Sequence, residues 1–250
     1  MFLIASYPRS GNHLVRFFVE YLTGRPTLGC YGNPEDVPVC NNTFPGADPL
    51  AHVCGEAIGQ KVHSAHEIDL VVPGMSIDGV VLIVRAPVEA ILSHEDKRPA
   101  VFYLRYLHRL RGGAKQYFAL IRRIEQLNAA VLTLRYEKLT SSNVDEATAE
   151  FDRLVRFLNL HCLSERVHEL RLNLAPLRAL NARAGNRSWG GIRSAFDPTF
   201  YAAHADKVTL RFTKMWIDHY ARALRGLKLH DCASQSLSLP WPSPTADDPP

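Results

Sequence analysis

The chain has 250 residues, of which 46% are hydrophobic and 22% are charged, a composition typical of a globular protein with a full hydrophobic core. Its formal net charge of +4 is too small an excess for the clustered positive field of a nucleic-acid-binding protein, but it suits an enzyme that holds a polyanionic small molecule. No segment approaches the roughly 18 consecutive apolar residues that a membrane span needs, and the N-terminus lacks the basic lead-in of a signal peptide, so we expect a cytoplasmic protein without a membrane span.

The first 23 residues predict a strand, a short turn and a helix. Phe2–Ser6 is apolar and strand-like, Tyr7–Gly11 carries turn residues, and the apolar positions that follow lie on one side of a helix. This order builds an anion site, because unpaired N–H groups and the positive end of the helix dipole converge on it. We expect a phosphate or sulfate to be held by Arg9 and by the backbone of Ser10, Gly11, Asn12 and His13. The alternative is that Arg9 is a surface arginine beside a turn.

The middle of the chain alternates irregular segments with short apolar runs. Residues 24–59 are rich in Gly, Pro, Asn and Cys, and we interpret them as an irregular insertion that forms a lid or acceptor loops. The five cysteines include no CxxC pair, and the group Cys30, Cys40, His52 and Cys54 matches no usual zinc spacing, so we expect reduced thiols and no metal.

Three further runs predict strands: Gln60–Ser64 weakly, and Val80–Val84 and Val131–Arg135 as buried parallel strands. Strands that alternate with helices indicate an α/β fold, here a single domain over residues 1–233 with a central parallel sheet flanked by helices. We expect helices over Ala100–Leu127, interrupted at Gly112-Gly113, from Ser142-Asn143 onward, and from Lys207 to about Leu224. The Pro/Ser-rich residues 234–250 predict a disordered tail.

Basic and aromatic residues follow the predicted strands. Because the carboxyl ends of parallel strands meet at one edge of a sheet, Arg9, His63, Arg85 and Tyr136 are expected there together. Arg85 is followed eight residues later by Ser93, so a guanidinium and a hydroxyl are available for a second anion. The alternative for Arg85 is a structural ion pair with a nearby glutamate.

These motifs carry a family resemblance. The segment Tyr7-Pro8-Arg9-Ser10-Gly11-Asn12, the pair Lys61-Val62-His63, the Arg85…Ser93 spacing and Tyr136-Glu137-Lys138-Leu139 together resemble the sulfotransferases that use 3′-phosphoadenosine 5′-phosphosulfate (PAPS). They occur in the family's order and span residues 4–139. The resemblance implies a P-loop-kinase-like sulfotransferase fold and transfer of a sulfuryl group to a hydroxyl or amine of a small-molecule or saccharide acceptor.

The resemblance also implies roles for single residues. Arg9 and the turn would hold the 5′-phosphate, Arg85 with Ser93 the 3′-phosphate, and Tyr136 would contact the adenine side. His63 would be the general base and Lys61 would stabilise charge on the bridging oxygen as adenosine 3′,5′-bisphosphate (PAP) departs, with no metal required. His66 and His13 are the competitors for the base. Arg183 and Arg187 loosely match a late basic segment of the family that completes the 3′-phosphate site.

The chain departs from the family in two places. Arg9 replaces the common lysine, which keeps the charge, and Leu14 stands where many members have a tryptophan against the adenine. Two other functions stay open: a P-loop-type phosphotransferase, although GxxxxGK[ST] is absent, and a catalytically inactive PAP-binding protein. The sequence does not indicate the acceptor or the oligomeric state.

Overall fold

The computed structural model describes residues 1–29, 57–72, 76–85, 90, 103–160 and 164–188, with side chains in the last two ranges only at 112–113, 115–160 and 165–181. The chain divides into two compact units, Met1–Arg85 with Ala119–Arg193, and Ala86–Phe118 with Ser194–Pro250. The first unit holds the sheet and most of the described residues. None of the described helices is long and apolar enough to cross a membrane.

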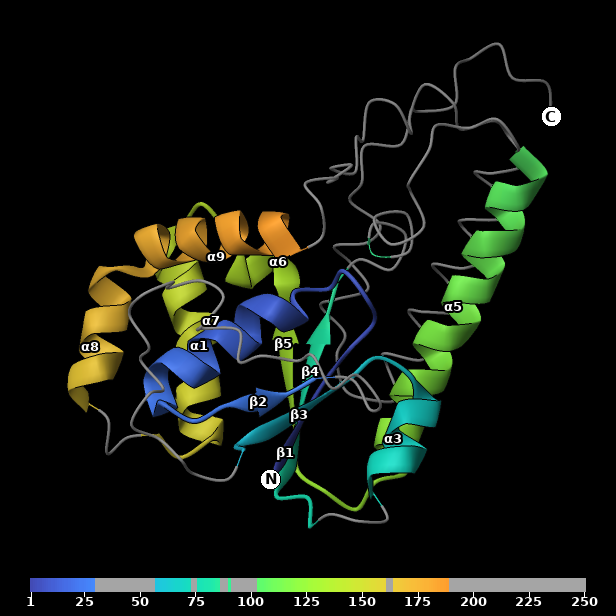
Figure 1. The fold of residues 1–250 in the computed structure, drawn as a ribbon, viewed down its shortest axis with the longest axis horizontal. Coiled ribbons are helices and arrows are strands. Elements are labelled where there is room, and N and C mark those ends of the chain that lie inside the picture. Colours follow the sequence, from blue (N-terminus) through green and yellow to red (C-terminus); the bar gives the residue numbers. More distant parts are fainter. Residues whose placement is uncertain (30–56, 73–75, 86–89, 91–102, 161–163, 189–250) are drawn as a thin grey trace, which may run out of the picture. The chain divides into compact units, whose positions relative to one another are not determined.

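The first unit is built on a five-stranded parallel sheet with the order β2-β3-β1-β4-β5 (Figure 1). The strands are β1 (Phe2–Ser6), β2 (Thr27–Leu28), β3 (Gly59–Val62), β4 (Gly79–Val84) and β5 (Val131–Arg135). All four pairings between neighbours are parallel. The α/β class, the parallel sheet and the four predicted strands are therefore confirmed. β3 ends at Val62 and not at Ser64, and β5, expected to be buried, lies at the end of the strand order with Val131 exposed.

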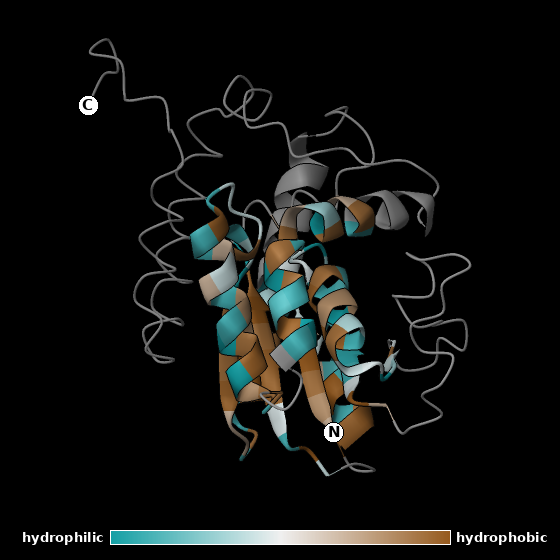
Figure 2. Ribbon diagram, turned by 90° about the vertical axis from the view of Figure 1, so that its left-hand side faces the viewer, coloured by the Kyte–Doolittle hydropathy of each residue, from teal (hydrophilic) through white to brown (hydrophobic). Residues whose placement is uncertain are grey.

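Both faces of the central strands are covered, as their continuous apolar sequence requires. Ile4, Val81 and Leu134 belong to one hydrophobic cluster with residues of the helices on that face. Leu3 and Leu82, which alternate with them along the strands, are equally buried toward the other face. Figure 2 shows the strands as largely hydrophobic, while the helices in front of them turn hydrophilic residues outward.

One face of the sheet carries α1 (Asn12–Thr23), α7 (Val144–Phe157), α8 (Ser164–Leu172) and α9 (Leu174–Ser188), which contribute to that cluster. Figure 1 shows α3 (Ala65–Val71) on the opposite side of the strands. The last turns of α5 (Tyr103–Glu125) join α3 through an ion pair between Arg123 and Asp69 at 2.5 Å. The short helix α6 (Tyr136–Leu139) follows β5 directly.

Two predictions about elements were wrong. The helix expected to break at Gly112-Gly113 runs through both glycines. A Cβ added to Gly112 would meet nothing within 4 Å, so no close contact requires glycine there. The segment 24–59 is not wholly irregular, because Thr27–Leu28 forms the edge strand β2. Residues 30–56, the predicted helix after Lys207 and the predicted tail lie outside the described residues.

Candidate functional site

The turn between β1 and α1 has a backbone shaped to surround an anion. Arg9 (φ 66°) and Gly11 (φ 93°) are both left-handed, and Ser10 between them is not. Such an alternation turns successive N–H groups toward one concave point, the arrangement called a nest. The N–H of Ser10 donates to the carbonyl of Tyr7 at 3.2 Å, so it closes the turn and is not the anion contact that the sequence predicted. An anion would therefore be bound by the backbone N–H groups that follow Ser10.

The N-terminus of α1 opens on this turn without a side-chain cap and with no acidic residue in its first turn. The N–H groups of a first helical turn have no acceptor within the helix. Beside them the hydroxyl of Ser10, which is fully buried, has no hydrogen-bond partner among the described residues. An anion would satisfy both the helix end and this hydroxyl. The side-chain amide of Asn12 instead donates to the carbonyl of Ile4 at 2.9 Å and ties the helix to β1.

Arg85 joins this turn from the neighbouring strand. β1 leads through α1 to β2 on one side of the sheet, whereas β4 leads to β5 on the other, so the strand order reverses between β1 and β4. Ligands of open α/β sheets bind at such a point, outside the carboxyl ends of the strands. Arg85 follows β4 there, and its Nη1 donates to the carbonyl of Arg9 at 2.8 Å, while the Arg9 side chain itself is exposed. Two guanidinium groups thus border the same turn.

Tyr136 closes the other side of the turn. The Arg85 Cζ atom lies 4.6 Å from the centroid of the Tyr136 ring, a cation–π arrangement. A Cβ built on Gly11 would stand 2.6 Å from Cδ2 of the same ring. Glycine is therefore required at position 11 for two reasons, the positive φ and the close approach of the ring.

His63 follows β3 and is held against the end of β1. The parallel register pairs Ala5 with Val62, so the next residues, Ser6 and His63, meet at the sheet edge. Nδ1 of His63 lies 2.7 Å from the carbonyl oxygen and 3.3 Å from the hydroxyl oxygen of Ser6. A carbonyl can only accept, so Nδ1 carries the hydrogen and the lone pair of the neutral ring is on Nε2.

The backbone of His63 is fixed by the helix after it. Ser64 caps α3 by accepting the N–H of Glu67, at 3.1 Å, and a carboxylate oxygen of Glu67 accepts the N–H of His63 at 2.5 Å. The pattern Ser64-x-x-Glu67 is a capping box in which the carboxylate bonds one residue further back than usual. Ser6 and Glu67 were not among the predicted site residues, although the capping-box spacing could have indicated Glu67.

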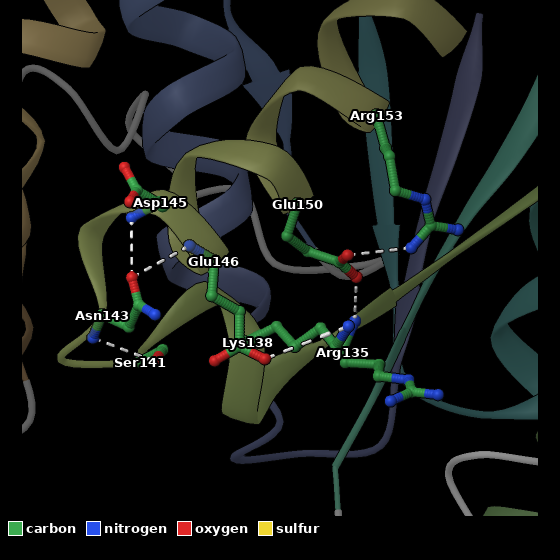
Figure 3. A network of polar contacts seen from close by, with 8 residues as sticks. All are labelled: Arg135, Lys138, Ser141, Asn143, Asp145, Glu146, Glu150 and Arg153. Atoms are coloured by element: carbon green, nitrogen blue, oxygen red, sulfur yellow. Dashed lines mark hydrogen bonds and ion pairs between the residues drawn. The ribbon is translucent and has the colours of Figure 1, made fainter.

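A polar network fixes the backbone that presents Tyr136 (Figure 3). Glu150 of α7, only 3% exposed, accepts the N–H of Arg135 at 2.7 Å and the guanidinium of Arg153 at 2.9 Å. Nearby, Asn143 caps α7 by accepting the N–H groups of Asp145 and Glu146. The predicted helix start at Ser142-Asn143 is confirmed, whereas the role of Glu150 has no signal in the sequence pattern.

The helix α9 brings two further polar contacts to the same edge. His13 Nδ1 lies 2.6 Å from Asn181 Oδ1, so His13 is bonded to α9. Arg178 donates to the carbonyl of Ser141 at 2.8 Å. Burial lowers the pKa of the Arg178 guanidinium, and the nearby Tyr136 acts in the opposite direction. Arginine stays charged at neutral pH nonetheless. Neither Asn181 nor Arg178 was predicted.

The remaining predicted residues lie as follows. Lys61 is partly exposed within β3, in register with Ile4, and His66 is exposed in the first turn of α3. Arg183 and Arg187 fall on α9, but their side chains, like the whole of Ser93, lie outside the described residues. Leu14, at the position of the family's tryptophan, is buried in the core cluster.

Within the described part of the chain, no group of three His, Cys, Asp or Glu residues could hold a metal ion. The cysteines and histidine weighed as a metal cluster lie outside it. No protein-family model matches the chain, and no curated protein is significantly similar to it in sequence.

Proposed function

We propose that this protein is a PAPS-dependent sulfotransferase with a P-loop-kinase-like sulfotransferase fold, acting on a hydroxyl or amine of a small-molecule or saccharide acceptor. The observation that carries the proposal is the Arg85–Arg9 hydrogen bond, because it joins two basic motifs, 76 residues apart in sequence, at the point where the strand order reverses. A nucleotide with phosphates on both the 3′ and 5′ positions of its ribose needs cationic groups for both, and Arg9 and Arg85 supply one each.

The turn after β1 is the proposed site for the 5′-phosphate. The uncapped first turn of α1 would supply N–H groups, Ser10 its buried hydroxyl, and Arg9 a guanidinium. Glycine at position 11 permits the positive φ that directs these N–H groups toward one point. These groups fit a phosphate without any metal ion, since the charge is neutralised by the protein.

The 3′-phosphate would bind Arg85, with Ser93, Arg183 and Arg187 as further candidates and the ring of Tyr136 beneath the Arg85 guanidinium. Arg85 donates from one nitrogen to the Arg9 carbonyl, and the fork of five N–H donors on a guanidinium matches the geometry of phosphate oxygens. Arg85 would in this way both shape the first phosphate site and form part of the second.

His63 is the proposed general base. Its Nδ1–H donates to the Ser6 carbonyl, so Nε2 would accept the proton of the acceptor hydroxyl as the acceptor oxygen bonds to sulfur. The bound donor supplies an activated sulfuryl group, whose bond to the phosphate oxygen breaks in the same displacement. Lys61, two residues earlier, would stabilise the charge left on that oxygen. His13, whose Nδ1 is likewise bonded, to Oδ1 of Asn181, is a competing candidate for the base.

The test is calorimetric titration of the chain with PAP, AMP and ADP in the absence of Mg²⁺. We expect micromolar binding of PAP, weaker binding of AMP by at least tenfold, and loss of that difference in Arg85→Ala, since a charge-assisted bidentate contact is worth about 1.5–3 kcal/mol.

The matched control for this test is Arg156→Ala, which removes an exposed arginine from the last turn of α7. That turn lies beside the amino-terminal ends of the strands, away from the proposed site, because Phe157 packs against Gly79 at the start of β4. PAP binding should be unchanged in this variant. A repeat titration with Mg²⁺ in which ADP binds in preference to PAP would reject the sulfotransferase proposal and favour the phosphotransferase. No nucleotide binding at all would reject both and favour a scaffold without a nucleotide site.

A further inference from the structure

Tyr136 meets Arg85 because of the sheet register. β4 and β5 pair in parallel with Val84 opposite Arg135, so the residues that follow each strand, Arg85 and Tyr136, leave the sheet edge side by side. The ring then lies under the guanidinium, with Cζ 4.6 Å from its centroid. A flexible arginine at a strand end is thereby held in one direction.

The same ring also contacts the turn that Arg85 binds. Its Cδ2 atom would be 2.6 Å from a Cβ on Gly11, so the ring packs directly on the glycine backbone. Arg85 in turn donates to the carbonyl of Arg9 in that turn. Each of the three groups therefore contacts the other two: the Tyr136 ring, the Arg85 guanidinium and the backbone of the turn.

The ring is carried on backbone that is itself fixed. Glu150 accepts the N–H of Arg135, the residue before Tyr136, and the carbonyl of Tyr136 accepts both the N–H and the hydroxyl of Thr140 at 2.9 Å. Leu139, on the same short helix, is completely buried. Hydrogen bonds therefore fix the backbone both before and after Tyr136.

We propose that Tyr136 is a positioning residue that determines specificity for a 3′-phosphorylated nucleotide by orienting the Arg85 guanidinium. This inference rests on the proposed function and deepens it. The aromatic ring is the feature that matters, since a cation–π contact needs the π face and not the hydroxyl. Tyr136 acts through Arg85, so its removal should weaken recognition of the 3′-phosphate and spare the 5′-phosphate.

The test compares the dissociation constants of PAP and AMP in Tyr136→Leu, Tyr136→Phe and the unaltered chain. Leucine keeps an apolar side chain against Gly11 but removes the π face. We expect Tyr136→Leu to weaken PAP binding by roughly fivefold to thirtyfold and AMP binding by less than about twofold. Tyr136→Phe should leave both constants within about twofold of the unaltered chain.

Tyr21→Leu is the matched control, because this partly buried tyrosine packs on Phe17 in the last turns of α1, away from the turn at its start. It should leave the PAP-to-AMP ratio unchanged, and thermal melts establish that each variant is folded. A normal ratio in folded Tyr136→Leu overturns the inference alone. A reduced ratio in Tyr136→Phe also overturns it, because the hydroxyl would then contact the nucleotide directly. If the unaltered chain does not prefer PAP, the proposed function fails and the inference fails with it.

Discussion

Arg9 occupies a backbone conformation that few residues other than glycine adopt. Its φ of 66° is left-handed, and a side chain with a Cβ pays roughly 1 kcal/mol or more for that conformation. Its side chain is exposed, and its carbonyl accepts a hydrogen bond from Arg85 at 2.8 Å. Strain of this kind is concentrated at functional sites. An exposed arginine in a strained turn beside an uncapped helix is therefore more consistent with ligand binding than with a structural role.

Replacing Arg9 by glycine should therefore affect stability and ligand binding in opposite directions. Arg9→Gly should leave the free energy of unfolding unchanged or raise it by up to about 1 kcal/mol, because glycine relieves the positive φ while adding entropy to the unfolded chain. The same substitution should weaken PAP binding by at least about tenfold, since it removes a charged hydrogen-bonding group. Urea denaturation and calorimetry measure the two effects.

Asn159 provides the control, because it is the other non-glycine residue with positive φ in the described ranges and follows α7 in an exposed position. Asn159→Gly should have a similar or smaller effect on stability and none on PAP binding. An Arg9→Gly protein that unfolds more easily, or that binds PAP normally, contradicts the assignment.

At the scale of elements, α6 and α7 form the support for the site. α6 has only four residues and cannot be stable by itself, so its position depends on its neighbours. Glu150 connects α7 to the start of α6 through the Arg135 N–H, and Figure 3 shows this carboxylate between the strand end and Arg153. A buried carboxylate that accepts two hydrogen bonds contributes more than an exposed ion pair does.

We therefore expect Glu150→Ala to lower the free energy of unfolding by about 2–3 kcal/mol, because the partly buried N–H of Arg135 loses its acceptor and α7 loses its tie to α6. Arg153→Ala, which removes the partner whose side chain is 42% exposed, should cost less than about 1 kcal/mol. Chemical denaturation of both variants decides the point. Equal losses would mean that the ion pair and not the backbone contact is the support.

At the scale of the whole molecule, the edge strand β2 depends on buried charge on α1. The buried Arg16 donates from Nε to the hydroxyl of Thr27 at 2.7 Å and from Nη2 to its carbonyl at 3.0 Å. Glu20, fully buried, accepts the N–H of Thr27 at 3.1 Å and also the hydroxyl of Thr27. These hydrogen bonds attach the two-residue strand β2, which makes few contacts of its own, to α1. Residues 30–56, which lie outside the described residues, begin two positions after it.

Thr27→Val removes the hydroxyl that both charged side chains use while it keeps the shape of the side chain. We expect a loss of about 2–4 kcal/mol in the free energy of unfolding, because Arg16 and Glu20 stay buried with fewer partners. Thr133→Val, in the partly exposed middle of β5, should change stability by less than about 0.5 kcal/mol. Urea denaturation of the two variants is the measurement, and similar losses would show that the buried charges do not need the hydroxyl.

The sequence alone was sufficient for the elements with a strong local pattern, but not for α5 across Gly112-Gly113 or for β2. Apolar runs rich in Leu, Ile and Val identified β1, β4 and β5. β1 and β4 are buried on both faces, whereas β5 lies at the end of the strand order and is buried only at Leu132 and Leu134. The turn residues Pro8 to Gly11 followed by an amphipathic segment identified the opening of α1, and Ser142-Asn143 identified the start of α7. The rule that parallel strands end at one edge then brought Arg9, His63, Arg85 and Tyr136 to the same region.

Contacts that depend on register and on which strands are neighbours required the tertiary structure. Nothing in the local pattern says that Ser6 lies beside His63 or that Arg85 lies on Tyr136, because both pairs follow from strand order and register across long sequence separations. The same holds for Glu150 and Asn181, whose partners lie 15 and 168 residues away. The position of a side chain could be predicted where local sequence spacing determines it. It could not be predicted where packing between segments distant in the sequence determines it.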